Sequence, residues 1–481
     1  MLSRREAIFL VVLFLASLPA VTTRLYSSDE VQYFSYLRSL WFDHDVSFEN
    51  EYRYFYDHNI AQTPAFYDTF LVRTEAATGR RINYATMGCA MLWSPFYGVG
   101  DLAARAMRAA GSSIAVDGYS RPYVSAVAYG SAFYGWAAVV LAVIAARRLV
   151  GERAVSSGII VWIGTPLLFY SYIAPPFSHA CSAFAVALFV TVWLRVRRDW
   201  SPRGAVLLGL AAALMAMVRE QDIFFALAVV VDFAVTAVRR HSAAAVSRHV
   251  RAALTGAAAF AVGYLPQLLA YTALNGSPRP SPLVARKMFW YAPHALQVLG
   301  DPQHGFFFWT PLAVLSVAGL IVMTFAPPGP ASHRPDTVPP SAPASPSDTM
   351  RQVRWIAACL LLMIALQVYI SGAVESWTVA GAFGQRRFVG CAILLVIGLA
   401  ALRAQLQGRM SRSVLNVTIA LCVWWNIALM AEFGTSMMSR QRLELRRNAY
   451  DAFVTLPRML PELLHRYFTE RASFYRSGET Q

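Results

Sequence analysis

Lysine, and charged residues in general, are scarce in this sequence. Lys287 is the only lysine, and Asp, Glu, Lys and Arg together make up 14% of the 481 residues, against roughly 25% in soluble domains. Hydrophobic residues make up 57% of the chain, and its mean hydropathy is +0.43. This composition excludes a soluble globular enzyme.

Cysteine is also scarce, and no pair of cysteines has the spacing of a redox or zinc motif. The five cysteines lie in or beside apolar runs: Cys89, Cys181, Cys359, Cys391 and Cys422. Neither a disulfide framework nor a zinc site is indicated. The net charge of +15 comes from arginines in short loops between apolar runs, and membrane topology explains such arginines. Nucleic acid is therefore not an expected partner.

Long apolar runs are abundant. About eleven of them reach the ~20 residues that a helix needs to cross a bilayer. They lie near residues 7–23, 123–146, 154–173, 177–194, 204–218, 223–238, 252–272, 306–326, 355–371, 388–402 and 414–431. A shorter run, Gly88 to Gly100, is expected to be an interfacial or re-entrant segment, and the count becomes about twelve if it crosses. The predicted fold is an all-α polytopic membrane protein.

The arginines predict which side of the membrane each loop faces. If 88–100 does not cross, every arginine-rich short loop faces the cytoplasm, as the positive-inside rule requires. The first apolar run is then a retained anchor, and 24–121 forms a long first extracytoplasmic loop. We expect a multi-pass protein of the inner (plasma) membrane. Its membrane domain spans 1–433 and includes a Pro-rich cytoplasmic loop at 327–350. The tail, 434–481, is expected to form amphipathic helices broken by Pro457 and Pro461.

The first extracytoplasmic loop opens with an acidic pair, Asp29 and Glu30, at the start of a predicted helix. Apolar residues recur at positions 33, 34, 37, 40 and 41, as on an interfacial amphipathic helix. Two interpretations are open. The acids belong to a functional site, or Ser28 or Asp29 caps the helix and the acids complement its dipole.

Six motifs, in this order along the chain, carry a resemblance to a known family. They are Asp29-Glu30, Trp93-Ser94-Pro95-Phe96-Tyr97, Phe177-Ser178-His179-Ala180, Arg219-Glu220-Gln221-Asp222, His304 to Pro311, and Trp377 with Gly381 to Phe388. With these motifs, an N-terminal anchor and a large first loop, the chain resembles the GT-C superfamily of membrane glycosyltransferases. It is similar to bacterial relatives of the protein O-mannosyltransferases and the lipid A aminoarabinose transferases. The resemblance implies a GT-C-like bundle.

The resemblance also implies an activity. A sugar on a polyprenyl-phosphate donor is transferred to a hydroxyl acceptor, which is a lipid, a glycan or a protein, on the extracytoplasmic side. By position Asp29 is the catalytic base, with Glu30 beside it. A carboxylate at the membrane face can take the proton of the attacking hydroxyl. A single base and a phosphate leaving group imply direct displacement with inversion, so no second carboxylate acting as a nucleophile is needed.

Fixed cations are expected where the phosphate leaves. Arg386 and Arg387 fit best, because guanidinium groups bind phosphate oxygens in bidentate fashion and neighbouring glycines permit close approach. The alternative is an arginine pair that snorkels at the start of a helix. Arg219 and Lys287 are secondary candidates. Either of them can equally serve lipid headgroups, and Arg219 can pair with a neighbouring acid.

Other polar residues are candidates for contacts with the sugar or the acceptor: His179, Glu375, Trp377 and His58. His179 can also be an interfacial histidine bonded to a carbonyl, and His58 a solvated loop residue. No cofactor is firmly indicated. Some GT-C enzymes use a divalent metal such as Mg²⁺ or Mn²⁺ and others do not, and no ligand spacing here identifies a site. Asp232, in the middle of an apolar run, is either a packing group or a functional acid.

Two other kinds of function compete with the transferase. A transporter or flippase for lipid-linked saccharides would need several buried charges and interrupted spans, and only Asp232 fits that pattern. A GT-C-shaped assembly protein without catalysis would keep the bundle but would not depend on Asp29. Membrane lipids are expected partners in all three cases.

Overall fold

The described part of the chain is helical. The computed structural model describes residues 2–151, 153–239, 243–326, 346–406, 408–471 and 474. Within these ranges every regular element is a helix, and the β-type pairing is limited to an isolated bridge between Thr74 and Arg81. The predicted all-α fold is confirmed for this part of the chain. Most of the predicted Pro-rich loop, 327–345, and the last residues of the tail, 475–481, lie outside the described residues.

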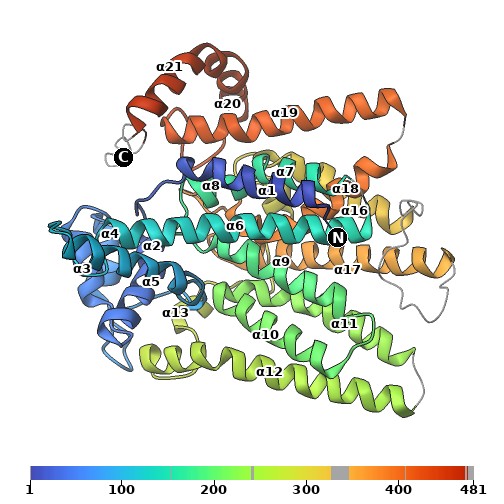
Figure 1. The fold of residues 1–481 in the computed structure, drawn as a ribbon, viewed down its shortest axis with the longest axis horizontal. Helices are drawn as coiled ribbons and strands as arrows, with labels where there is room; N and C mark the ends of the chain where they lie inside the picture. Colours follow the sequence, from blue (N-terminus) through green and yellow to red (C-terminus); the bar gives the residue numbers. More distant parts are fainter. Residues whose placement is uncertain are drawn as a thin grey trace. The chain divides into compact units, whose positions relative to one another are not determined.

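Helices occupy all the predicted apolar runs (Figure 1). The main ones are α1 (Arg4–Ser17), α6 (Arg121–Leu149), α9 (His179–Val196), α10 (Pro202–Val218), α11 (Phe225–Val238), α12 (Ala243–Asn275), α17 (Pro346–Ala373), α18 (Ala392–Gln405) and α19 (Arg409–Gly434). Seven helices among the described residues are long and apolar enough to cross a membrane, as expected of a multi-pass membrane protein. The total number of crossings stays a prediction.

Two of the predicted runs are interrupted at a proline. Run 154–173 is two helices, α7 (Ala154–Ile163) and α8 (Leu167–Tyr172), separated at Pro166. Run 306–326 is likewise α15 (Phe306–Trp309) and α16 (Leu312–Phe325), separated at Pro311. Proline lacks the backbone N–H of a helix interior and disfavours helical geometry in the residue before it, so a single unbroken helix at these places was a wrong expectation.

Helix α5 (Gly88–Ala109) is longer than the apolar run that predicted it. It continues through Asp101, which is 8% exposed and has partners for its carboxylate. Arg105 Nε donates to Asp101 Oδ2 over 2.9 Å, and the Tyr123 hydroxyl donates to Oδ1 over 2.6 Å. Because the acid is satisfied, the helix can run past it.

The chain folds as two compact units, each made of segments that are separate in sequence. Of the described residues, unit 1 comprises those within 2–145 and 170–288, and unit 2 comprises those within 146–169, 289–326 and 346–474. The predicted boundary at residue 433 stays a prediction.

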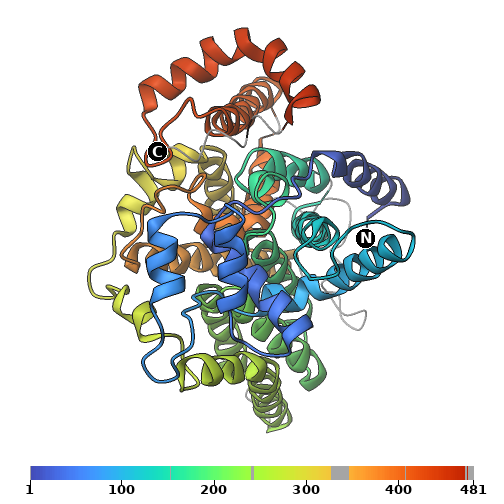
Figure 2. The ribbon, with the colours of Figure 1, turned by 90° about the vertical axis from the view of Figure 1, so that its left-hand side faces the viewer.

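In unit 1, the helices of the first loop gather at the Arg121 end of α6. They are α2 (Ser28–Arg38), α3 (Glu49–Asp57), α4 (Pro64–Phe66) and α5 (Figures 1 and 2). Aromatic rings hold them there: Tyr123 of α6 lies 5.0 Å from Tyr97 and 5.7 Å from Phe42 between ring centroids. Beyond them, α10 packs against both α9 and α12. A Cβ on Gly209 would lie only 2.2 Å from the Gly256 carbonyl oxygen, so small residues set the close approach of α10 and α12.

Unit 2 has the same kind of close contact at its centre. A Cβ on Gly319 of α16 would lie 1.8 Å from the carbonyl oxygen of Gly398 on α18. Helix α17 packs on α16, and α7 packs on α18. Helix α14 (Ala295–Gly300) lies against α17. The two central helices therefore touch backbone to backbone, and a side chain larger than hydrogen would separate them.

The tail forms helices α20 (Leu445–Tyr450) and α21 (Leu456–Thr469), which pack on α19. Leu456 and Leu463 bury against Ala428 of α19. That the tail 434–481 is amphipathic stays a prediction, but the predicted break at Pro461 is wrong, because α21 continues through that residue. Pro457 stands at the start of α21, where a proline leaves no intrahelical hydrogen bond unmade.

The buried Asp232 of α11 is ion-paired. Arg197 Nε and Nη2 each donate to its carboxylate over 3.0 Å, and Trp193 Nε1 donates over 2.9 Å. Of the two interpretations of Asp232, the structure supports a packing role, because three donors compensate the buried carboxylate.

Candidate functional site

The acidic pair stands in the first turn of α2, and a capping box fixes that turn. Glu30 Oε2 accepts the backbone N–H of Ser27 over 2.9 Å and that of Tyr26 over 2.6 Å, while the Ser27 hydroxyl accepts the Glu30 N–H. The N-cap is thus Ser27, and the expectation that Ser28 or Asp29 caps the helix is wrong. Glu30 is the carboxylate of the box, which leaves the half-buried Asp29 outside this arrangement.

Burial gives Glu30 an unusual proton affinity. Its side chain is 0% exposed, and burial raises its pKa to about 7, although the N–H groups of Tyr26 and Ser27 act in the opposite direction. The second oxygen, Oε1, has no hydrogen-bond partner among the described residues. Near neutral pH this carboxyl group therefore exchanges a proton directly beside Asp29.

One face of α2 carries Asp29, Tyr33 and Tyr36, which are four and three residues apart and so lie on one side of a helix. The Tyr33 hydroxyl lies near Ser178 and interacts electrostatically with both Asp29 and Arg219. Burial raises the pKa of Tyr33, and Arg219 opposes that shift. Asp29 and Arg219 therefore act on the same tyrosine with opposite effects on its pKa.

Arg219 reaches this place because α10 ends at Val218. Its own backbone is extended, with φ −151° and ψ 117°, and a 3₁₀ helix, η4 (Glu220–Phe224), follows. Arg219 Nη1 lies 2.7 Å from His179 Nδ1 at the start of α9. A guanidinium can only donate, so Nδ1 must accept and the proton of a neutral His179 sits on Nε2. Arg219 therefore keeps its full charge beside a neutral ring.

The rest of the Arg219 motif is also buried and bonded. Asp222 is 0% exposed, and its Oδ2 accepts the Ser182 hydroxyl of α9 over 2.6 Å. Glu220 accepts the Tyr271 hydroxyl of α12. These two acids are held by hydroxyl groups. Asp222 also interacts electrostatically with Arg219, so the anticipated interaction of Arg219 with a neighbouring acid exists beside its contact with His179.

Two further candidates of unit 1 have local partners. Lys287, at the end of α13 (Pro282–Arg286), lies over the ring of Tyr84, with Nζ 5.1 Å from the centroid. His58 stacks on Tyr54 at 4.0 Å, and its Nδ1 lies 2.7 Å from the Tyr54 carbonyl oxygen. His58 is exposed, so this stacking favours the interpretation as a loop residue.

The remaining candidates lie in unit 2. Arg387 is 9% exposed, and it donates to the Ser376 carbonyl oxygen over 2.8 Å and to the Ser376 hydroxyl over 3.1 Å. Arg386 is half-buried, and Glu375 is exposed. Trp377 stacks on His294 at 5.4 Å, and its carbonyl oxygen accepts Gln385 Nε2 over 3.0 Å. The loop that carries Glu375 and Trp377 is thus tied to the segment that carries the two arginines.

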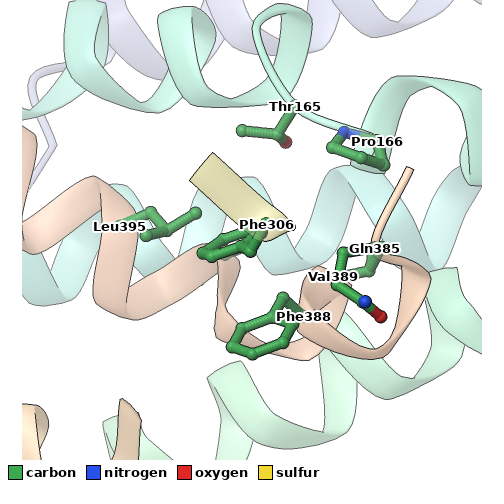
Figure 3. Close-up of a pocket in the computed structure, with 8 residues that line it drawn as sticks. Thr165, Pro166, Phe306, Gln385, Phe388, Val389 and Leu395 are labelled. Atoms are coloured by element: carbon green, nitrogen blue, oxygen red, sulfur yellow. The ribbon is translucent and has the colours of Figure 1, made fainter. Parts of the chain in front are cut away.

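A small pocket of unit 2 brings two of the sequence motifs together (Figure 3). Phe306 and Phe388 stack at 4.2 Å on one side of it. Thr165 and Gln385 supply its polar groups, and Gln385 Nε2 also donates to the carbonyl oxygen of His304 over 3.2 Å. With mostly apolar walls, the pocket suits an apolar group better than a charged one.

Metal ligands do not converge in the parts of the chain that the structure describes. No group of three or more His, Cys, Asp or Glu side chains among those residues could hold a metal ion. The dependence on Mg²⁺ or Mn²⁺ therefore stays open.

The sequence interpretation missed Tyr33, Tyr36 and Ser178. Tyr33 and Tyr36 could have been found, because they follow Asp29 at helical spacing and share its face. Ser178 stands inside a motif that was quoted for its histidine. The bond between Glu220 and Tyr271 joins residues 51 positions apart, and no local pattern signals it.

No family model matches this sequence, and no curated protein matches it. Among solved structures, the chain is similar to the crystal structure of ArnT from Cupriavidus metallidurans bound to undecaprenyl phosphate. The similarity covers 98% of this chain and 74% of that one, with a TM-score of 0.49 and 13% sequence identity. Undecaprenyl phosphate is a ligand of that ArnT.

Proposed function

We propose that the chain is an integral-membrane glycosyltransferase of the GT-C type. In this proposal it moves a sugar from a polyprenyl-phosphate donor to a hydroxyl acceptor, with Asp29 as the general base. Two observations support the proposal: the capping box fixes the first turn of α2, which carries the half-buried Asp29, and Arg219 is held against His179 over 2.7 Å. Unit 1 therefore offers a proton acceptor and a fixed cation, and both also act electrostatically on Tyr33. That is the pair of groups that such a transfer needs.

The proposed step balances without a covalent enzyme intermediate. The acceptor hydroxyl oxygen attacks the anomeric carbon, and its proton passes to the Asp29 carboxylate. The bond between the anomeric carbon and the phosphate oxygen breaks, and the polyprenyl phosphate leaves with the electron pair. Attack opposite to the leaving group inverts the anomeric centre. Arg219 stabilises the charge that grows on the phosphate, because its guanidinium is always charged and donates in a planar fork.

The neighbouring candidates have supporting roles in this proposal. Glu30 fixes the first turn of α2 through the capping box and so orients Asp29. His179 holds the Arg219 guanidinium, with which it shares the 2.7 Å contact. Lys287 is a further candidate for the phosphate, and His58 for the acceptor.

The unit 2 candidates have proposed roles too. Arg386 and Arg387 are proposed to bind the donor phosphate, and Glu375 and Trp377 to contact the sugar or the acceptor. Replacing both arginines by Gln should then weaken capture of undecaprenyl phosphate, and an unchanged affinity would remove them from the site. The acceptor is proposed to be a lipid, a glycan or a protein on the extracytoplasmic side of the inner membrane.

Replacing Asp29 tests the proposal most directly. Asp29→Asn keeps the size of the side chain but cannot accept the hydroxyl proton, so transfer should fall by a factor of roughly 10² to 10⁴, the usual contribution of a general base. The assay follows the radiolabelled sugar of a polyprenyl-phosphate donor into the acceptor fraction of membranes. Carrier affinity should not change, because the substitution leaves Arg219 in place.

Asp68→Asn is the matched control, since Asp68 is an exposed acid of the same loop that belongs to no proposed site. Equal transfer by the Asp29→Asn variant and this control would sink the proposal. Absence of transfer by the wild type as well would favour a transporter or a non-catalytic assembly protein, neither of which needs the base.

A further inference from the structure

A cluster of buried polar groups lies beyond Tyr33 on the same face of α2. We name it the Tyr36 cluster, and its members are Tyr36, Glu220, Gln267 and Tyr271, all of unit 1. Tyr36 interacts electrostatically with Glu220 and lies beside Gln267. The Tyr271 hydroxyl donates to Glu220 Oε1. The cluster thus joins α2, η4 and α12 around one polar centre.

Two members of the cluster have unused hydrogen-bonding capacity. Tyr36 and Gln267 are each 0% exposed. Gln267 Oε1 accepts the Met87 backbone N–H over 2.9 Å, but Gln267 Nε2 has no well-formed hydrogen bond within the described residues. The Tyr36 hydroxyl has none there either, since its contact with Gln267 lacks the geometry of a hydrogen bond. A buried polar group without a partner opposes folding, so such groups are usually kept for a ligand or for ordered water.

The free groups match the hydrogen-bonding pattern of a carbohydrate. A sugar hydroxyl both donates and accepts. Gln267 Nε2 offers a donor, the half-buried Glu220 carboxylate an acceptor, and the Tyr36 hydroxyl both. A site whose polar groups pair only with a ligand hydroxyl also rejects ligands that lack this hydroxyl, because such a ligand leaves the buried polar groups unpaired.

We propose that the Tyr36 cluster binds the hydroxyl groups of the sugar that the donor carries. This inference rests on the proposed function, because it assumes that Asp29 and Arg219 mark where the anomeric carbon and the phosphate lie. Tyr36 follows Tyr33 by one turn of α2, so the cluster continues the same face. Arg219 and the cluster then divide the donor between them: the guanidinium binds phosphate, and the cluster binds sugar.

The test compares lipids with and without a sugar. The probes are undecaprenyl phosphate alone and a panel of polyprenyl phosphates that carry a pentose, a hexose or an amino sugar. Binding to the full-length chain in lipid nanodiscs is measured by titration. We expect the wild type to bind at least one sugar-bearing lipid at least tenfold more tightly than undecaprenyl phosphate. Tyr36→Phe should abolish this preference, while the affinity for undecaprenyl phosphate stays the same.

Tyr36→Phe is also safe for folding, because the hydroxyl that it removes has no well-formed bond to lose. Gln267→Glu is the second variant: it keeps the oxygen that accepts the Met87 N–H and replaces only the free donor. Tyr52→Phe is the matched control. It removes a buried hydroxyl that donates to the Ile82 carbonyl oxygen over 3.0 Å, so it should lower the melting temperature but keep the preference.

Two results would overturn the inference: a wild type with no preference for any sugar-bearing lipid, or variants at Tyr36 and Gln267 that both keep the preference. In the second case the cluster holds ordered water or serves packing. Failure of the proposed function looks different, because it is read from transfer and not from lipid binding: the wild type then shows no transfer, or the Asp29→Asn substitution leaves transfer unchanged.

Discussion

The buried carboxyl group of Glu30 should make the folded protein more stable in mild acid than in mild base. Burial raises its pKa from 4.5 to about 7, so between these values the folded state holds a proton that the unfolded state has lost. Stability from this group is complete below about pH 4.5 and is lost as the pH rises through 7. A shift of this size corresponds to about 3 kcal/mol of unfolding free energy at 1.36 kcal/mol per pH unit.

Glu30→Gln isolates this contribution. Glutamine keeps an oxygen for the N–H groups of Tyr26 and Ser27 but carries no charge at any pH. The variant should match the wild type near pH 4.5 and become more stable than it above pH 7. Comparison with the wild type is needed because burial also raises the pKa of Glu51 to about 7. Glu51 therefore gives both proteins a similar decrease of stability with rising pH.

The assay is thermal unfolding of the detergent-solubilised chain, followed by tryptophan fluorescence from pH 4.5 to 8.5. The quantity of interest is the melting temperature of Glu30→Gln minus that of the wild type. It should increase with pH and level off above about pH 8. A difference that stays constant over this range, or that decreases, would show that Glu30 is ionised in the folded state at low pH and that the capping box outweighs burial.

Two other substitutions test the local interpretation of the fold. Ser27→Ala should cost about 1 kcal/mol of unfolding free energy by removing the N-cap of α2, whereas Ser28→Ala should cost much less; equal melting temperatures for these two variants would contradict the assigned cap. Asp232→Asn leaves Arg197 buried without a full countercharge, so it should destabilise the chain by roughly 3 to 5 kcal/mol in denaturant unfolding, and a wild-type unfolding curve would contradict the buried ion pair.

Most of the helical content could be predicted from the sequence, because in a membrane protein a backbone must satisfy its own hydrogen bonds wherever the side chains are apolar. The apolar runs around α6, α9 and α19 therefore located these helices. The same argument missed the break at Pro166, where one proline outweighs a run of apolar neighbours. It also ended the segment 88–100 before Asp101, whereas α5 continues past that acid, whose carboxylate accepts the Tyr123 hydroxyl.

The candidate site, too, could be predicted only in part from the sequence. The sequence by itself determined that Asp29 and Glu30 begin a helix and that Tyr33 and Tyr36 share a face with Asp29, because helical spacing follows from the backbone alone. The tertiary structure decided what that face meets. Arg219, Ser178 and Gln267 come from helices far along the chain, and helix periodicity gives the direction of a side chain but not the identity of its neighbour.

A comparison of two buried acids shows why the sequence predicts some contacts and misses others. Glu30 and Asp232 were both candidates for functional carboxylates, Glu30 because it stands beside Asp29 and Asp232 because it lies in the middle of an apolar run. Glu30 accepts hydrogen bonds from the backbone N–H groups of Ser27 and Tyr26, three and four residues before it, and a local sequence pattern can reveal such bonds. Asp232 accepts a hydrogen bond from Arg197, 35 residues away in the sequence. Sequence patterns describe contacts made within a helical turn or two. Contacts between helices depend on how each helix is rotated and packed, and only the folded chain fixes those.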